Sequence, residues 1–412
     1  MKYTKSERNF IFYDVGNSAY ILIATTMIPI FFNLLAKEDL DPATYLAYWG
    51  YAVTFSTLVT AILGPFLGAY ADIHGKRKIF FGLFFLLGFL GCLLQPLPTS
   101  WLAFLILYIL TKVGFNGSLV FYDSMLKDIT SDDRMDMVSS AGYAWGYVGS
   151  CLPFILCLGL LLFHEKIGLT IRPASILIFV IIALWWLAFT LPLLRTYQQG
   201  PREENSLARQ SLKESLKEIK KDKRLFFFLL SFLFYIDGVY TIINMATAYG
   251  SSLGLDQKGL ILALLMTQFV AFPCAIFFGR LSKKVDAAKL LMVTILAYTC
   301  IAIFAVFLKT LTHFWILAAL VGMFQGAIQA LSRSYFAKLI PQEKSSQYFG
   351  IYDIFGKGAS MFGTFVVSLI SQVTGNQSKA LLVLVVFFIL GLIFFYKSAF
   401  HKEKTVSYDV YP

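Results

Sequence analysis

The chain has 412 residues, of which 58% are hydrophobic and 14% charged, and its formal net charge is +11. Ordinary soluble domains carry roughly 25% charged residues, so this composition excludes a soluble protein and predicts an integral membrane protein. No phosphate-binding loop of the Walker type occurs, and the five cysteines and four histidines show neither disulfide-like nor ligand-like spacing. We therefore expect no ATPase or other enzyme activity, no cofactor and no metal.

Twelve apolar runs are long enough to cross a bilayer, which takes about 20 residues. The first run is too long for a signal-peptide core and lacks its small-residue cleavage pattern, so we expect it to persist as the first helix. The predicted fold is an all-α bundle of twelve transmembrane helices. The runs begin near Asn9, Tyr45, Ile79, Trp101, Val138, Pro173, Leu225, Gln257, Ala288, Thr312, Ser346 and Ser378.

Two segments, 121–150 and 331–360, each end one apolar helix, cross a short charged loop and enter a glycine-rich helix. Tyr122 to Leu126 corresponds to Ser332 to Phe336 at an offset of 210 positions, which indicates two fused halves. Membrane halves related by a parallel repeat are typical of secondary transporters whose central site opens to either side. We expect one six-helix half at 1–194, a cytoplasmic linker with an amphipathic helix at 195–224, a second six-helix half at 225–400 and a tail at 401–412.

Most of the 35 lysines and arginines fall in loops on one predicted side of the membrane. By the positive-inside rule that side is cytoplasmic and holds both termini. Since no basic stretch outside the spans carries interleaved aromatic residues, we expect contact with membrane lipids and no binding of nucleic acid. The linker helix is expected to lie on the anionic leaflet, with a regulatory or partner-binding role as the alternative. The absence of transit-peptide features favours a bacterial inner (plasma) membrane, and we expect a monomer.

The loop between the second and third runs reads Gly68-Ala-Tyr-Ala-Asp72-Ile-His-Gly75-Lys76-Arg77-Lys78. It resembles the GxxxD(R/K)xGR(K/R) signature of the major facilitator superfamily. We expect Gly68 and Gly75 to permit close packing and a tight turn, Asp72 to attract a helix N-terminus, and the basic residues, Arg77 included, to face the inner leaflet. Such a loop would act as a latch. A degenerate copy runs from Gly279 to Asp286, and the alternative is that both are merely positive-inside loops.

The segment Phe12-Tyr13-Asp14-Val-Gly16-Asn17-Ser18-Ala19-Tyr20 resembles the YDxxNSAY opening of one branch of that superfamily, the vacuole-effluxer, autophagy-linked family. The resemblance implies a twelve-helix permease whose fungal relatives release amino acids from the vacuole into the cytosol. It extends over both halves, with further matches at Phe115 to Tyr122, Val138 to Tyr147, Tyr235 to Val239, Gln329 to Ala337 and Phe349 to Tyr352.

Ionisable residues inside spans are costly, by roughly 2.5 to 3.5 kcal/mol on insertion scales, and so mark a pathway or a buried pair. The near balance of negative and positive groups fits internal pairing, and it also suits a zwitterionic solute. Polar residues recur at helical spacing on the first, fourth, seventh and tenth helices, which line the central cavity in the superfamily. The predicted substrate pathway comprises Asp14, Asn17, Lys112, Asn116, Asp237, Tyr240, Asn244, Gln325, Gln329 and Lys357.

Several of these charges have a more specific predicted role. Asp14 and Asp237 occupy near-equivalent positions in the two halves and are the candidates for proton coupling, with gating or packing as the alternative. Asp123 and Arg333 are equivalent in the repeat and are predicted to pair as a cytoplasmic gate, with separate pairings inside each half as the alternative. Asp353, also assigned to gating, and Lys357 are four residues apart and can pair within their helix. Alternatively, Lys357 binds a substrate carboxylate.

These features together predict a secondary active transporter that moves a small polar or zwitterionic, amino-acid-like solute by alternating access, with protons as the expected coupling ion. One alternative is an exporter of larger metabolites or drugs. Another is a non-transporting membrane receptor or scaffold, against which the buried charges argue.

Overall fold

The computed structural model describes residues 2–200, 212–374 and 377–400, which form helices joined by short connections. Residues 201–211 of the expected linker and the expected tail at 401–412 lie outside the described residues. Within the described part of the chain, twelve helices are long and apolar enough to cross a membrane. The α-helices are α1 (Lys5–Ala36), α2 (Pro42–His74), α3 (Arg77–Leu94), α4 (Trp101–Ile129), α5 (Asp132–Phe163), α6 (Ile171–Thr196), α7 (Leu212–Lys221), α8 (Lys223–Ser252), α9 (Gln257–Leu281), α10 (Ala287–Val306), α11 (Leu311–Leu339), α12 (Ser345–Thr374), α13 (Gln377–Ala380) and α14 (Leu382–Ala399).

Several helices begin before their apolar runs, most clearly α1 and α5, because their first turns are polar. α1 begins at Lys5, where the Thr4 hydroxyl accepts a hydrogen bond from Glu7 N and the Glu7 carboxylate accepts one from Thr4 N. α5 begins at Asp132, where two aspartates in the first turn favour the positive end of the helix dipole. The last predicted span is divided into the short α13 and the longer α14. Helix ends therefore follow the capping residues, whereas the apolar runs mark only the membrane-crossing part.

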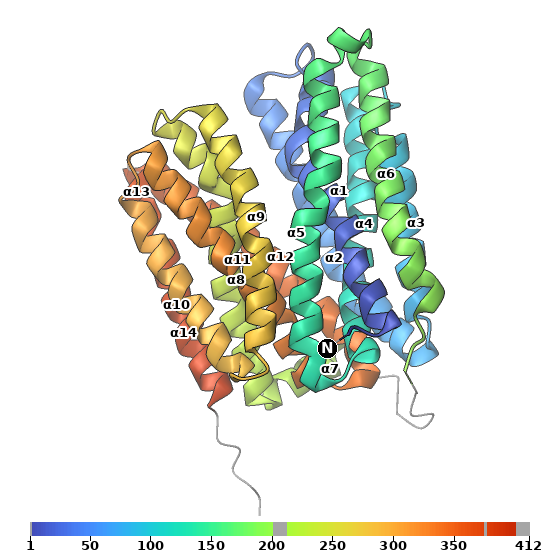
Figure 1. Ribbon diagram of the computed structural model, residues 1–412, viewed down its shortest axis with the longest axis vertical. Helices are drawn as coiled ribbons and strands as arrows, with labels where there is room; N and C mark the ends of the chain where they lie inside the picture. The colour runs from blue at the N-terminus through green and yellow to red at the C-terminus, as the bar shows by residue number, and fades with distance from the viewer. Residues whose placement is uncertain (1, 201–211, 375–376, 401–412) are drawn as a thin grey trace, which may run out of the picture.

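The helices pack as two groups. Helices α1 to α6 form a first group, in which α1 packs against α5 and α6, and α3 packs against α4. Helices α8 to α14 form a second group, in which α8 packs against α12 and α14, and α9 packs against α11. The groups meet where α2 lies against α12 and where α5 lies against α9 and α11. Figure 1 shows the two groups close together at the end where α1 begins, here called the basal end, and diverging toward the opposite, distal end.

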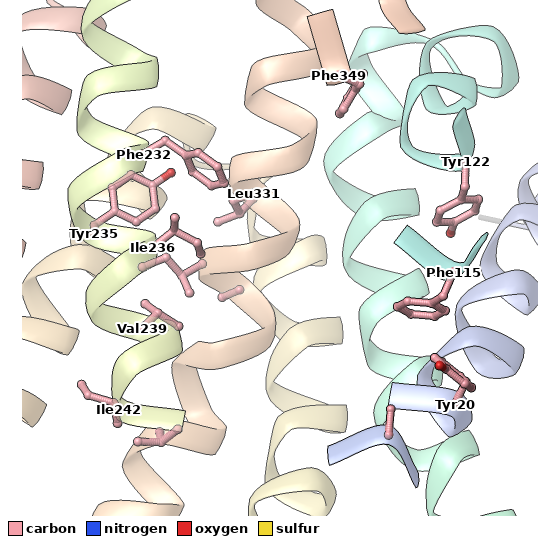
Figure 2. Packing of buried hydrophobic residues seen from close by; sticks show 14 of the residues in the cluster. Tyr20, Phe115, Tyr122, Phe232, Tyr235, Ile236, Val239, Ile242, Leu331 and Phe349 are labelled. Carbon is pink, nitrogen blue, oxygen red and sulfur yellow. The ribbon is translucent and has the colours of Figure 1, made fainter. Parts of the chain in front are cut away.

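The interior of each group is apolar and aromatic. In the first group Trp186 is fully buried, and its ring centre lies 5.5 Å from that of Tyr20 and 5.7 Å from that of Phe115. In the second group the rings of Phe232 and Tyr352 stack at 4.1 Å. Figure 2 shows these as separate clusters, with Tyr20 and Phe115 in one and Phe232 in the other. Because lipid tails are as apolar as these side chains, close packing is what favours helix association inside each group.

The amphipathic helix expected in the linker is α7, and it is anchored to the second group. Ile219 is buried, while Leu216, one turn earlier, is exposed. The Glu218 carboxylate lies 3.0 Å from Lys344 Nζ and accepts a hydrogen bond from the Tyr348 hydroxyl at 3.0 Å. The helix is therefore tied to the start of α12 as well as to the beginning of α8.

Candidate functional site

A band of polar and charged side chains lies between the two groups of helices. Where both partners are described, the hydrogen bonds and ion pairs that join the groups lie between the middle of the bundle and its basal end. The band has three levels. The first, at the basal end, surrounds Arg77, the second surrounds Arg333, and the third, near the middle, contains Lys112, Asn116 and Lys357.

Arg333 forms the second level. It belongs to α11 in the second group, its side chain is 2% exposed, and its hydrogen-bond partners among the described residues all belong to the first group. Nη1 donates to Asp123 Oδ1 at 3.0 Å, and Nη2 donates to Asp14 Oδ2 at 3.3 Å. Nε donates to Ser139 Oγ at 2.9 Å. The guanidinium carbon lies 4.5 Å from the ring centre of Tyr143, which adds a cation–π contact.

This arrangement places Asp123 and Arg333 in direct contact across the boundary between the groups, as the repeat predicts. The additional contact between Arg333 and Asp14 is a finding that the sequence did not indicate, because these residues do not occupy equivalent positions in the repeat. One guanidinium is therefore shared by two carboxylates of the other group. Its function as a gate remains a prediction.

Asp14 is held in place by its own group. Its Oδ2 accepts a hydrogen bond from the Tyr122 hydroxyl at 2.7 Å, and its Oδ1 accepts one from Asn17 Nδ2 at 3.2 Å. A Cβ atom on Gly142 would lie 2.1 Å from Asp14 Oδ2 and 3.1 Å from Arg333 Nη2. Only glycine at position 142 leaves room for this ion pair beside α5.

The basal level joins the α2–α3 turn to the start of α12. Arg77 Nη2 lies 2.7 Å from Asp72 Oδ1, and Arg77 Nη1 pairs with Asp128. Asp72 accepts hydrogen bonds from the backbone N–H groups of Ser346, at 3.2 Å, and Gln347, at 2.9 Å. These are among the donors that an α-helix leaves unpaired in its first turn. Asp72 of the first group therefore caps a helix of the second group.

The expectation that Arg77 faces the inner leaflet is wrong. Its side chain is 1% exposed, and its Nε donates to Ser346 Oγ at 2.7 Å. A buried guanidinium requires anionic partners, and the second of them, Asp128, was not singled out from the sequence. An acidic residue in the last turn of a predicted span is the signal that marks it. Burial raises the pKa of the Tyr197 phenol, which keeps its proton and donates to Asp128.

Gly68 and Gly75 lie where the chain requires glycine. A Cβ on Gly68 would lie 2.5 Å from the carbonyl oxygen of Ser346, so α2 approaches α12 backbone to backbone. Gly75 has a φ of 62°, in the left-handed region that favours glycine, and it allows the sharp turn between α2 and α3. Further along the same crossing, a Cβ on Gly350 would lie 2.5 Å from Pro65 N.

The degenerate copy of this loop, between α9 and α10, makes a different contact. Gly279 again approaches the other group, since an added Cβ would lie 2.5 Å from Ser140 Cβ of α5. At the position that corresponds to Asp72, however, the chain has the exposed Lys283. Asp286 caps its own helix, α10, by accepting from Ala288 N at 2.7 Å.

A cavity of about 640 Å³ opens at this second contact. The ion pair between Lys338 Nζ and Asp136 Oδ2, at 2.6 Å, crosses between the groups beside it. Charges of both signs line the cavity, among them Asp132, Asp133, Asp136, Arg224, Lys283 and Lys338. The two related loops therefore close the basal end to different degrees.

The third level contains the lysines that lie within the spans. On α12, Lys357 Nζ lies 2.7 Å from Asp353 Oδ1. On α4, Lys112 has no ion-pair partner among the described residues, and its Nζ lies 5.7 Å from the ring centre of Phe115. Asn116, one turn further along α4, is 2% exposed, and its Nδ2 finds no acceptor in the described part of the chain.

Asp237 has surroundings unlike those of Asp14. It is buried on α8, and its Oδ1 accepts from Gly363 N at 3.0 Å and from the Thr241 hydroxyl at 3.3 Å. Within the described residues it has no ion-pair partner. The two predicted proton-coupling carboxylates therefore differ, because among the described residues only Asp14 is paired with a cation. Tyr240 and Asn244 follow Asp237 along α8, half-buried and exposed respectively.

The predicted glutamines lie on α11, one and two turns before Arg333. Both Gln325 and Gln329 are buried. Gln329 Oε1 accepts a hydrogen bond from the Tyr147 hydroxyl of α5 at 2.9 Å, so this polar contact also crosses between the groups.

Lys127 is another residue that the sequence did not single out. Its Nζ donates to the carbonyl oxygens of Ala337, at 2.7 Å, and Ile340, at 2.6 Å, and thereby satisfies the end of α11 from the other group. A lysine in the last turn of a span has the same sequence signature as any positive-inside charge, so the sequence does not indicate this contact. Among the described residues, no three His, Cys, Asp or Glu side chains gather as a metal site requires.

The chain is similar in sequence to a protein-family model and to several curated proteins. The model of the family described as "Vacuole effluxer Atg22 like" matches residues 41–136 and 127–406. The uncharacterized MFS-type transporter YxiO of Bacillus subtilis (strain 168) is 40% identical over 420 residues, which cover 99% of this chain and 97% of that protein. Autophagy-related protein 22 of Coccidioides immitis (strain RS) is 24% identical, over 80% of this chain and 68% of that protein.

Solved structures share the fold at low sequence identity. FucP, a major facilitator transporter in its outward conformation, superposes with a TM-score of 0.71 at 12% identity, covering 97% of this chain and 98% of that one. The proton:xylose symporter XylE superposes with a TM-score of 0.72 at 13% identity, covering 97% and 95%. The protein is therefore an integral membrane secondary transporter, and it belongs to the Atg22-like vacuole effluxer family of the major facilitator superfamily.

Proposed function

We propose that the protein carries a small polar or zwitterionic, amino-acid-like solute by alternating access and couples this movement to protons. The observation that supports the proposal most is the Arg333 cluster, in which a buried cation of one group of helices is neutralised by Asp14 and Asp123 of the other. Charges buried at such a boundary are costly, so they mark a pathway, a closure or a buried pair. The amino-acid-like solute is supported by the family resemblance.

Alternating access requires contacts between two halves that break at one end while the interior of each half stays packed. The contacts between the two groups include ion pairs and hydrogen bonds, whose groups water hydrates when the contact opens. The aromatic clusters around Trp186 and around Phe232 lie inside the groups. We therefore propose that residues 1–194 and 225–400 move as the two units.

Asp237 is the better candidate for the proton site. A buried carboxylate without a cation gains from binding a proton, which removes its charge, and loses the proton when water or a cation reaches it. Asp14 already shares Arg333 with Asp123, so any proton on Asp14 competes with that ion pair. Asp14 is therefore suited to gating, with Asp237 carrying the coupling proton.

We place the basal end in the cytoplasm of a bacterial cell, with the protein as a monomer in the plasma membrane. The start of α1, the lysines at 76 and 78 and the lysine-rich α7 all lie at this end, as the positive-inside rule requires of the cytoplasmic side. The similarity to a Bacillus subtilis protein supports the bacterial membrane. In this orientation the described arrangement is closed toward the cytoplasm.

The test is counterflow in liposomes that contain the purified protein. A labelled mixture of the common amino acids is added outside vesicles preloaded with the same unlabelled mixture, with and without an imposed pH gradient. We expect saturable counterflow, and accumulation that depends on the gradient. Asp237→Asn should abolish gradient-driven accumulation and spare exchange, while Asp39→Asn, at an exposed position in the α1–α2 connection, serves as the matched control.

Two results would count against the proposal. If folded protein gives no counterflow above empty liposomes, the solute is not an amino acid. If counterflow is present but accumulation is unchanged in both Asp237→Asn and Asp14→Asn, coupling through these carboxylates is excluded.

A further inference from the structure

Lys112 and Lys357 bring two positive charges to the third level of the polar band, and Asp353, paired with Lys357, brings one negative charge. We propose that Lys112, Lys357 and Asn116 together bind a carboxylate group of the transported solute. This inference rests on the proposed function and narrows its substrate class to solutes that bear a carboxylate. The site draws on both groups of helices, because Lys112 and Asn116 belong to α4 and Lys357 belongs to α12.

Lys112 supplies the first reason. It stands in the middle of a membrane-crossing helix, and its ammonium group has no ion-pair partner among the described residues. Its Nζ lies 5.7 Å from the ring centre of Phe115, a cation–π contact. An aromatic face compensates only part of the hydration that an ammonium group loses on burial. Such a cation is suited to an anion that arrives from solution.

Asn116 supplies the second, independent reason. Its side chain is 2% exposed and its Nδ2 donor is unpaired in the described part of the chain, although most buried polar groups in proteins have partners. It lies one turn from Lys112 and two turns from Asp123, which contacts Arg333 of the second group. The opposite face of α4, at Gly114 and Gly117, packs against α3. Asn116 therefore lies on the face turned toward the second group.

Lys357 completes the site from that second group. Helices α4 and α12 run antiparallel from the contact between the Ser124 and Ser346 hydroxyls, which lie 3.1 Å apart. Lys112 lies twelve residues back along α4 and Lys357 eleven residues on along α12, so the two like charges stand at similar heights and repel each other across the boundary between the groups. Asp353, 2.7 Å from Lys357, offsets only one of the two positive charges. Lys112, Lys357 and Asp353 together therefore carry a net charge of +1. A carboxylate between the two ammonium groups removes both the repulsion and the excess charge.

The chemistry of a carboxylate matches these donors. It has two oxygen atoms with about four acceptor sites, enough for two ammonium groups and one amide N–H. Hydrogen bonds between charged partners are also the strong ones. Because the donors come from both groups of helices, a bound carboxylate links the two moving units. A neutral amide of the same size links them much less effectively.

The experiment compares acids with their amides on the full-length protein in liposomes. Counterflow of the labelled amino-acid mixture is measured against three competitors: unlabelled amino acids, the corresponding amino-acid amides, and simple carboxylates such as lactate. We expect the amino acids to compete about ten- to hundredfold better than their amides, the factor that a charge-assisted hydrogen bond supplies. Competition by lactate distinguishes a site for carboxylates in general from one that also requires the ammonium group.

Four variants locate the effect. Lys112→Gln and Lys357→Gln should each reduce the preference for acids over amides at least tenfold, and Asn116→Ala should reduce it less. Lys112→Arg keeps the charge and should retain most of the preference, which a purely structural role for Lys112 would not produce. Lys309→Gln, at an exposed position between α10 and α11, is the matched control and should leave the preference unchanged.

Thermal stabilisation of the detergent-solubilised protein by the same acids and amides separates this inference from the proposed function. Stabilisation by acids in the wild type, lost in Lys112→Gln, supports the site even if counterflow is absent and the transport proposal fails. Equal competition by acids and amides in the wild type overturns the inference and leaves transport standing. Failure of every carboxylate both to compete and to stabilise also overturns it.

Discussion

The basal end of the molecule is closed by two related contacts that differ in chemistry. In the first, between the α2–α3 turn and α12, Arg77 is buried between Asp72 and Asp128, and Asp72 caps α12. In the second, between the α9–α10 turn and α5, Lys283 replaces the capping aspartate and Ala288 stands where the arginine would be. A cavity of about 640 Å³ remains beside it.

The comparison teaches that a repeat of sequence need not repeat an energetic role. Both loops keep the glycine that allows a close crossing, Gly68 in one and Gly279 in the other. Only the first keeps the buried charges that require each other as partners. We therefore expect the first contact to dominate the stability of the closed form, and the second to yield first when the basal end opens.

Breaking the first contact should have the largest effect. Asp72→Ala leaves Arg77 with only one carboxylate and removes the cap of α12, and loss of one partner of a buried ion pair costs about 3–5 kcal/mol. We expect a lower melting temperature and loss of counterflow. Lys283→Ala, at the corresponding exposed position, should change stability by less than about 0.5 kcal/mol. Equal effects of the two changes would contradict the comparison.

Replacing the crossing glycines should have the next largest effect. Gly68→Ala drives a Cβ against the backbone oxygen of Ser346, which cannot move without shifting α12, and overpacking of this kind costs about 1–3 kcal/mol. Gly279→Ala meets the side chain of Ser140 instead and should fall at the lower end of that range. Melting curves of the two variants measure the difference. A larger loss in Gly279→Ala would show that the second contact is the tighter one.

Introducing the charged residues of the first contact into the second tests whether those residues account for the difference between the two contacts. The double change Lys283→Asp with Ala288→Arg installs the residues of the first loop. If the new pair adds about 1 kcal/mol to the closed form, opening of the basal end, and with it counterflow, should slow about fivefold. An unchanged exchange rate in protein of normal stability would mean that this contact does not limit opening.

The smallest effect is expected where α7 joins α12. Lys344 and Glu218 are 31% and 40% exposed, and an exposed ion pair contributes about 0–1 kcal/mol. Lys344→Ala should therefore leave the melting temperature and counterflow nearly unchanged at physiological salt. A loss of activity as large as that of Asp72→Ala would reveal a regulatory role for α7.

The helices could be predicted from the sequence because membrane-spanning runs are long, and the contact of Asp123 with Arg333 could be predicted because the repeat places them at equivalent positions. That Asp72 would attract a helix N-terminus was also expected.

The burial of Arg77 could not be predicted, since a basic residue in a loop has the same sequence signature whether it faces lipid headgroups or two carboxylates. The ion pair of Arg333 with Asp14 depends on how the two groups dock, which no local pattern encodes. The different surroundings of Asp14 and Asp237 could not be predicted either. The two residues occupy similar positions in their halves, and only the docking of the groups brings a cation to Asp14.

The most direct test of the account is a charge reversal at the level where the two groups share a cation. Asp123→Arg and Arg333→Asp, alone and together, are compared by counterflow in liposomes, with each variant shown to be folded by its melting curve. The account predicts that each single variant loses most activity, because it leaves like charges facing each other where Arg333 now meets Asp123 at 3.0 Å. It also predicts that the double variant regains a substantial part of that activity. A double variant no more active than either single one would show that this ion pair is not the gate between the two groups.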